Sequence, residues 1–130
     1  MAFHTAEAVE AAFYQAFAEC DSDAMRTLWA EGEVVCMHPG ALPLLSHESV
    51  MRSWEHMFTG ARMPALSTRL IKRIATDDMA LHLVEERVGE PAAIVLATNV
   101  YRQIGGSWLM VSHQGVLMSS GRAPDKRTLQ

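Results

Sequence analysis

The stretch AIVLATNVYRQIGGSWLMVSH, residues 93–113, decides the fold class of this 130-residue chain. Its first half is apolar on both faces, which is typical of a central strand. Gly105-Gly106 has the composition of a tight turn between two antiparallel strands. Two further strands are predicted upstream, at 66–74 and 79–88, each followed by turn residues. The second half of the chain is therefore predicted to form an antiparallel meander.

Three helices and one short strand are predicted before this meander. In residues 5–20 apolar side chains recur at spacings of three and four, which places them on one face of a helix. A second helix follows Asp21, and a third covers about 47–59. A short strand at 34–37 ends where Pro39 interrupts its hydrogen bonding. Helices followed by a meander predict an α+β fold, with three N-terminal helices packed on a strongly bent antiparallel sheet.

Length, composition and charge exclude several classes of protein. The chain fits one domain over residues 1–118, followed by a polar tail at 119–130. No apolar run approaches the roughly 20 residues of a membrane helix, and the start lacks a secretory signal, so we expect a cytoplasmic protein. The formal net charge is −4 and the basic residues are scattered, which argues against nucleic acid and membrane partners.

The residues that commonly hold metals or cofactors show no such pattern. Cys20 and Cys36 are too few for a disulfide framework, and their spacing matches no zinc motif. The six histidines include no H-x-H pair and no pair at i, i+4 on a helix. A glycine-rich phosphate loop is also missing. We therefore expect neither a metal site nor a cofactor.

Four short motifs, in this order, resemble the SnoaL-like branch of the NTF2-like, ketosteroid-isomerase-like superfamily. Residues 21–29 (DSDAMRTLW) look like its second helix, and 35–40 (VCMHPG) look like its "V-x-x-H-P-G" strand and turn. Residues 47–54 (HESVMRSW) and 108–114 (WLMVSHQ) are similar to its third helix and closing strand. The resemblance covers about residues 6–118. It implies a cone with an apolar pocket between sheet and helices, and homodimerisation through the outer face of the sheet.

The resemblance also identifies candidate catalytic residues. Steroid isomerases of this superfamily use a carboxylate base just before a proline, and the matching residue here is His38, which can move a proton near neutral pH. Asn99 stands where that family has a protonated acid, and an amide can still donate a hydrogen bond. Tyr14, or Phe13 in the other register, falls nearest the family's helix tyrosine. Because the carboxylate base is missing, the resemblance argues against ketosteroid isomerase activity itself.

Five further side chains are predicted to contact a ligand: Phe17, Met37, Trp54, Phe58 and His113. For three candidates a structural role is the alternative. His38 could instead hydrogen-bond the turn beside it, and Trp54 could be ordinary core. Counting along the strand puts His113 on the same face as Leu109 and Val111, either in the pocket or at the dimer face.

The strand at 79–88 carries a polar set whose orientation the sequence leaves open. Alternation groups His82 with Glu86 on one face, and Glu85 with Arg87 on the other. We interpret this set as solvated or facing a dimer partner, with an internal acid as the alternative.

These observations lead to two hypotheses about function. The first is a protein that binds an apolar small molecule and, if it is an enzyme, acts as a cofactor-free proton-transfer isomerase, cyclase or dehydratase. In that case His38 would be base or acid and Asn99 would steady an oxyanion. The alternative is a non-catalytic dimeric binding or interaction module, which the missing carboxylate favours.

Overall fold

The computed structural model of the chain describes residues 2–60 and 62–120. Its elements, in chain order, are α1 (Ala6–Glu19), α2 (Ser22–Leu28), β1 (Val35–Met37), α3 (His47–Phe58), β2 (Leu66–Ala75), β3 (Met79–Val88), β4 (Ala93–Ile104) and β5 (Ser107–Ser120). The predicted α+β fold is confirmed. Of the predicted tail, Ser119 and Ser120 complete β5, and the rest lies outside the described residues. Among the described helices, none has the length and apolarity needed to cross a membrane.

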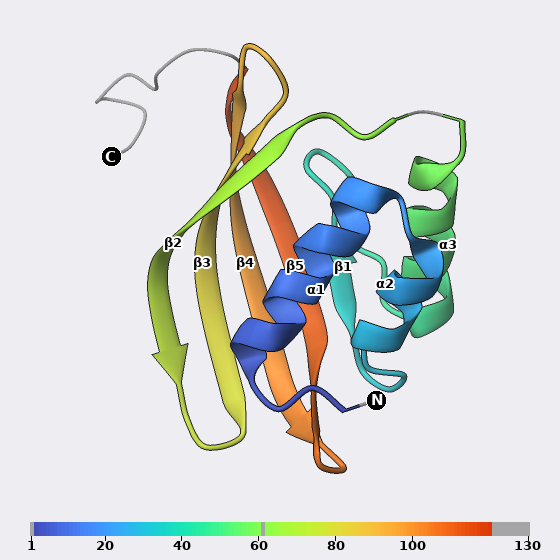
Figure 1. Ribbon diagram of the computed structural model, residues 1–130, viewed down its shortest axis with the longest axis vertical. Helices are drawn as coiled ribbons and strands as arrows, with labels where there is room; N and C mark the ends of the chain where they lie inside the picture. Colours follow the sequence, from blue (N-terminus) through green and yellow to red (C-terminus); the bar gives the residue numbers. More distant parts are fainter. Residues whose placement is uncertain (1, 61, 121–130) are drawn as a thin grey trace.

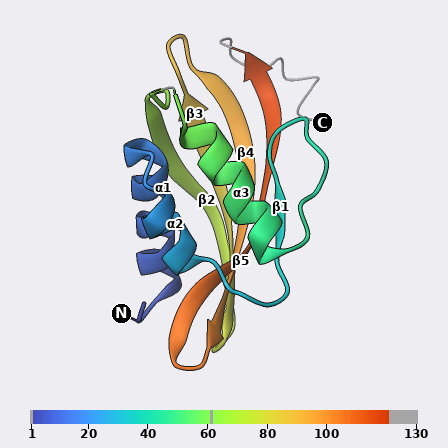
Figure 2. The same ribbon diagram turned by 90° about the vertical axis from the view of Figure 1, so that its right-hand side faces the viewer.

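The five strands form one sheet in the order β1-β5-β4-β3-β2. Strands β2 to β5 are the predicted antiparallel meander. The short β1 is the exception, because it pairs with β5 in parallel and makes the sheet mixed. All three helices lie over one face of this twisted sheet (Figure 1), and the view from the side shows α1, α2 and α3 in front of the strands (Figure 2). We call the helix-covered face the inner face and the other the outer face.

The helices begin and end at residues that satisfy their free backbone groups. Thr5 caps α1 by accepting a hydrogen bond from the Ala8 N–H at 3.1 Å. At the other end Cys20 adopts a left-handed conformation, with φ of 53°, and closes the helix. Helix α3 begins with a capping box in which Ser46 and Ser49 each bond the other's backbone. These caps set where α1 and α3 begin and where α1 ends.

The core lies between the helices and the inner face. Buried apolar side chains from α1, α2, α3 and the sheet form one cluster, which includes Val9, Phe13, Ala16, Met25, Leu28, Trp29, Val50, Met51, Trp54, Tyr101 and Met110. Within this cluster Phe13 of α1 packs edge-on against Trp54 of α3, with 5.6 Å between ring centroids. Burial of these large side chains supplies the main driving force for folding.

A β-bulge in β5 decides which of its residues face the core. Tyr101 pairs with Met110, but the next residue, Val100, pairs with Ser112, so Val111 is an extra residue. As a result Met110 and His113 both face inward although they are three positions apart. Counting residues therefore does not settle which face His113 lies on, because simple alternation fails at a bulge; of the two positions considered for it, His113 lies in the pocket wall.

Candidate functional site

A pocket of about 260 Å³ opens between the second half of α1, helix α3 and one end of the sheet. Most of its wall is apolar: Phe13, Phe17, Pro39, Trp54, Met57, Met63, Pro64, Leu66, Val88, Ala93 and Val95. Four polar side chains also line it, namely Tyr14, His38, Glu86 and His113. They come from α1, from the end of β1, from β3 and from β5. An apolar cavity with a few converging polar groups is the usual form of a small-molecule site.

His38 is held by α3 in one tautomer. Its Nε2 lies 3.0 Å from Ser53 Oγ, and that hydroxyl already donates its proton to the Val50 carbonyl at 2.7 Å. Ser53 must therefore accept from His38, so Nε2 carries the proton and Nδ1 has a free lone pair. Burial lowers the pKa of His38, which makes the neutral ring the dominant form at pH 7. His38 is thus available as a proton acceptor at Nδ1.

Glu86 faces the pocket and bonds to α1. The Tyr14 hydroxyl donates to Glu86 Oε2 at 2.7 Å. Burial raises the pKa of Glu86 above its ordinary value, and the nearby Glu10 charge adds to this, although the bond from Tyr14 opposes it. Burial and the Glu86 charge also raise the pKa of Tyr14, which keeps its proton. The interpretation of Glu86 and His82 as solvated is wrong, since both are buried on the inner face.

His113 is oriented by Asn99 from the neighbouring strand. The Asn99 amide donates to Tyr14 Oη at 2.9 Å, so its Oδ1, 2.6 Å from His113 Nδ1, accepts the proton of that nitrogen. His113 Nε2 is then unprotonated. Burial, together with the nearby His38, lowers the pKa of His113 to about 3. Asn99 therefore bridges two pocket residues without lining the pocket itself.

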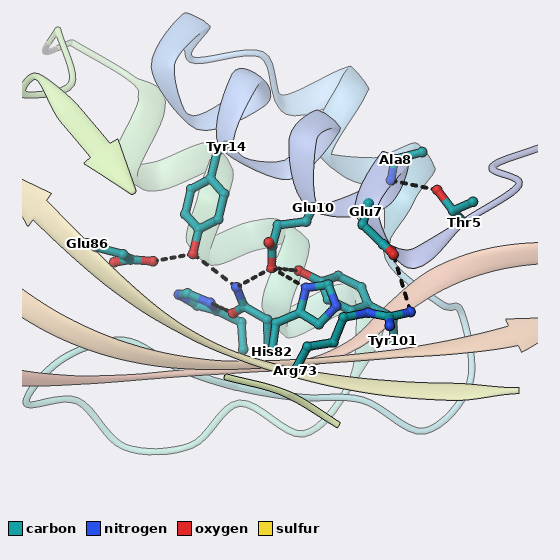
Figure 3. A network of polar contacts seen from close by, with 11 residues as sticks. Thr5, Glu7, Ala8, Glu10, Tyr14, Arg73, His82, Glu86 and Tyr101 are labelled. Atoms are coloured by element: carbon teal, nitrogen blue, oxygen red, sulfur yellow. Dashed lines mark hydrogen bonds and ion pairs between the residues drawn. The ribbon is translucent and has the colours of Figure 1, made fainter. Parts of the chain in front are cut away.

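A second polar cluster lies beneath the first two turns of α1, on the N-terminal side of the pocket residues of this helix (Figure 3). Glu10 Oε1 accepts from Tyr101 Oη at 2.6 Å, from His82 Nδ1 at 3.0 Å and more weakly from Asn99 Nδ2 at 3.4 Å. Figure 3 shows Glu10 and Tyr14 reaching from the same helix toward the sheet. This cluster was not predicted. The signal that could have found it is spacing, because Glu10 stands four residues before Tyr14 on the same helix row.

The predicted site residues fall into two groups. Tyr14, Phe17, His38, Trp54 and His113 line the pocket. Three others do not reach it: Asn99, Met37 and Phe58. Phe58 packs behind Trp54, with 5.7 Å between ring centroids, and Met37 is half-buried in β1. Within residues 2–60 and 62–120, no three His, Cys, Asp or Glu side chains are grouped as metal ligands.

Comparison with known proteins finds one matching family model and solved structures with the same fold. The model of the SnoaL-like domain family matches residues 6–119. A crystal structure from Thiobacillus denitrificans, described as a "putative calcium/calmodulin-dependent protein kinase type II association domain", is 35% identical, with a TM-score of 0.83, covering 92% of this chain and 99% of that one. No curated protein matches the sequence.

Two more distant structures share the fold. A "putative dehydratase from the NTF2-like family" of Streptomyces avermitilis is 25% identical, with a TM-score of 0.71, covering 84% of this chain and 90% of that one. A ketosteroid isomerase-like protein of Erwinia carotovora atroseptica is 16% identical, with a TM-score of 0.73, covering 88% and 94%. The second likeness concerns the fold alone.

Proposed function

The chain belongs to the SnoaL-like domain family, and from that premise we propose that its pocket binds an apolar small molecule and catalyses proton transfer on it without a cofactor. Isomerases, cyclases and dehydratases all carry out such steps. One observation carries the proposal. His38 and Glu86 reach the same apolar pocket, and burial lowers the pKa of His38 and raises that of Glu86, which favours the uncharged form of each group.

The roles of the two groups follow from their proton states. Neutral His38 takes a proton from the substrate at Nδ1, because its Nε2–H is bound to Ser53. Glu86, whose raised pKa favours the carboxylic acid, returns a proton to another atom of the substrate. Asn99 acts through other residues, since its amide holds Tyr14 and His113 in place. The chain resembles a Streptomyces structure described as a "putative dehydratase", and a dehydratase would use such an acid–base pair.

The test is exchange of carbon-bound protons in D₂O. Cyclohexanone and 2-cyclohexenone are incubated with the protein, and deuterium incorporation beside the carbonyl is followed by NMR. We expect the wild-type protein to accelerate exchange and His38→Ala to reduce that acceleration about 100-fold, the lower range for loss of a general base. His56→Ala is the matched control, because His56 is exposed on the same helix as Ser53. Exchange at the rate of buffer, or an unaffected His38→Ala variant, would contradict the proposal.

A non-catalytic binding role is the second candidate, and a specific observation favours it. The hydrogen-bond donors of the pocket residues are already used: Tyr14 donates to Glu86, His38 to Ser53 and His113 to Asn99. Apart from the acid form of Glu86, no free donor among them is left to hold an enolate oxygen, which enolising enzymes need. A protein that binds ligands in this pocket and yet shows no exchange would establish this candidate.

We also propose that the chain forms a homodimer through the outer face of its sheet. In the described part of the chain no helix covers this face (Figure 1). Its apolar residues include Ile74, which is 59% exposed, and Val116, which is 58% exposed, beside the half-buried Leu81, Leu83, Leu96 and Val100. An uncovered apolar face of this kind marks an interaction surface. The description of the Thiobacillus relative as an association domain supports assembly.

Sedimentation analysis tests the dimer. The wild-type protein should sediment as a dimer, and Leu83→Arg, in the middle of the outer face, should shift it to monomer. Leu42→Arg changes a loop residue that is 85% exposed and should leave the dimer intact. A monomeric wild-type protein would refute the proposal.

A further inference from the structure

The polar groups of the pocket offer acceptors to a ligand, while their own protons are bound to the protein. From this asymmetry we infer that the ligand is a protonated amine carried on an apolar or aromatic body. The inference rests on the proposed function, because it names the chemical class of the small molecule for the same pocket. It also differs from what the superfamily's steroid isomerases bind, since a ketone offers no hydrogen-bond donor.

Three acceptor atoms remain after the internal hydrogen bonds are counted. His38 keeps a lone pair on Nδ1 because its Nε2–H bonds Ser53. His113 keeps a lone pair on Nε2 because its Nδ1–H bonds Asn99. Glu86, when it is ionised beside a bound cation, keeps Oε1 as an acceptor, since Tyr14 bonds Oε2. A primary ammonium group has three N–H donors and no acceptor, so it complements this set of atoms.

The charge of the pocket wall favours a cation. Glu86 carries the one carboxyl group of the described pocket wall, and no lysine or arginine lines it. Arg87, its neighbour in β3, bonds Glu85 on the opposite face of the sheet. A buried carboxylate without a cation is costly, and burial accordingly raises the pKa of Glu86. A bound ammonium ion would supply the missing charge.

The apolar wall adds a second attraction for such a ligand. Phe13, Phe17 and Trp54 line the pocket, and Trp54 stands edge-on to His38 with 4.8 Å between ring centroids. Aromatic faces attract ammonium groups, and the effect grows when the pair is removed from water. The same rings bury the ligand's hydrocarbon part. The pocket therefore suits an arylalkylamine or alkylamine better than a carboxylate or a neutral ketone.

The test compares three probes of similar shape and different charge: 2-phenylethylamine, 2-phenylethanol and phenylacetate. Dissociation constants are measured by calorimetry at pH 8, where an alkylamine remains protonated. We expect the amine to bind at least tenfold more tightly than the alcohol, and phenylacetate to bind most weakly. Glu86→Gln should weaken the amine at least tenfold and change the alcohol by less than about twofold.

Two further variants separate charge from folding. Glu86→Asp keeps the charge and should retain the preference for the amine. Glu85→Gln removes a carboxylate from the outer face of the same strand and should leave all three constants unchanged.

Three results would overturn the inference. The first is an alcohol that binds as tightly as the amine, and the second is an amine whose affinity survives Glu86→Gln; in either case the pocket itself would stand as a binding site. The third is binding of none of the probes, which would overturn the proposed pocket as well.

Discussion

Each end of the inner face contains a glutamate that bonds to neighbouring side chains, but the two glutamates differ in how many hydrogen bonds they accept and in whether a cavity lies beside them. At one end Glu10 meets His82 and Tyr101, and its carboxylate accepts a hydrogen bond from each at 3.0 Å or less. At the other end Glu86 has one bond, from Tyr14, and faces a cavity of about 260 Å³. Both carboxylates lie between α1 and the sheet. Residue type and burial therefore do not distinguish a structural cluster from a candidate site. The distinction lies in how many hydrogen-bonding atoms remain without a partner and in whether a cavity adjoins them.

The strongest way to break this comparison is to remove each carboxylate in turn. Glu10→Ala should lower the free energy of unfolding by about 3 kcal/mol, because it strands the buried His82 and Tyr101 donors without an acceptor. Glu86→Ala should cost about 1 kcal/mol or less, since only Tyr14 loses a partner and a cavity already adjoins it. Urea unfolding at pH 7 measures both values. Equal losses would show that the two ends do not differ in the way proposed.

The second largest effect is a loss of stability toward unfolding when the pH is lowered. His113 stays neutral in the folded protein down to its pKa of about 3, whereas in the unfolded chain it takes up a proton below about pH 6.5. The unfolded state then binds more protons, so stability falls as the pH drops through this window. Between pH 7 and pH 5 the loss attributable to His113 should be about 2 kcal/mol.

The variant His113→Gln isolates this contribution. Glutamine can still donate a hydrogen bond to Asn99 but does not titrate, so its unfolding free energy should fall about 2 kcal/mol less than that of the wild-type protein between pH 7 and pH 5. Glu86 and His38 titrate in both proteins and cancel in the difference. His56→Gln, at an exposed position, should follow the wild-type curve. Parallel curves for His113→Gln and wild type would show that His113 has the same pKa in the folded and the unfolded chain, contrary to this prediction.

The smallest expected effect comes from adding a methyl group at Gly115, beside the pocket. A Cβ on Gly115 would lie 3.2 Å from Pro39 Cγ and 3.2 Å from Val95 Cγ1, and both residues line the pocket. Gly115→Ala should therefore cost about 1 kcal/mol and displace Pro39, which adjoins His38. The expected readout is a lower urea midpoint together with weaker binding of 2-phenylethylamine. Gly32→Ala is the control, because no atom lies within 4 Å of its Cβ position; an equal effect there would contradict the steric explanation.

The fold could be predicted because its signals are local. The spacing of apolar residues in α1 and the Gly105-Gly106 turn between β4 and β5 each act within a few residues, and both predictions are confirmed. The parallel pairing of β1 with β5 was not foreseen. It joins residues as distant as Val35 and Ser112, and no local pattern records such a contact.

The site was less predictable because strand alternation groups residues without saying which group is inside. His82 and Glu86 do share a face, as predicted, but the interpretation of that face as solvated is wrong. Two facts of the assembled fold decide it: α1 covers the face, and Glu10 provides a partner for His82. The tautomers of His38 and His113 depend likewise on Ser53 and Asn99, which only the folded chain brings near.

The extra residue in β5 also bears on how homologous genes are to be compared. Val111 has no partner in β4, so the strand carries one residue more than its neighbour between Met110 and Ser112. A gene that lost this codon would keep His113 inside on a regular ladder. An ungapped alignment with such a gene would instead match His113 to a residue that points out of the pocket. An alignment with a homologue that lacks the bulge therefore needs a single-residue gap opposite Val111, so that structurally equivalent positions of the last strand are compared.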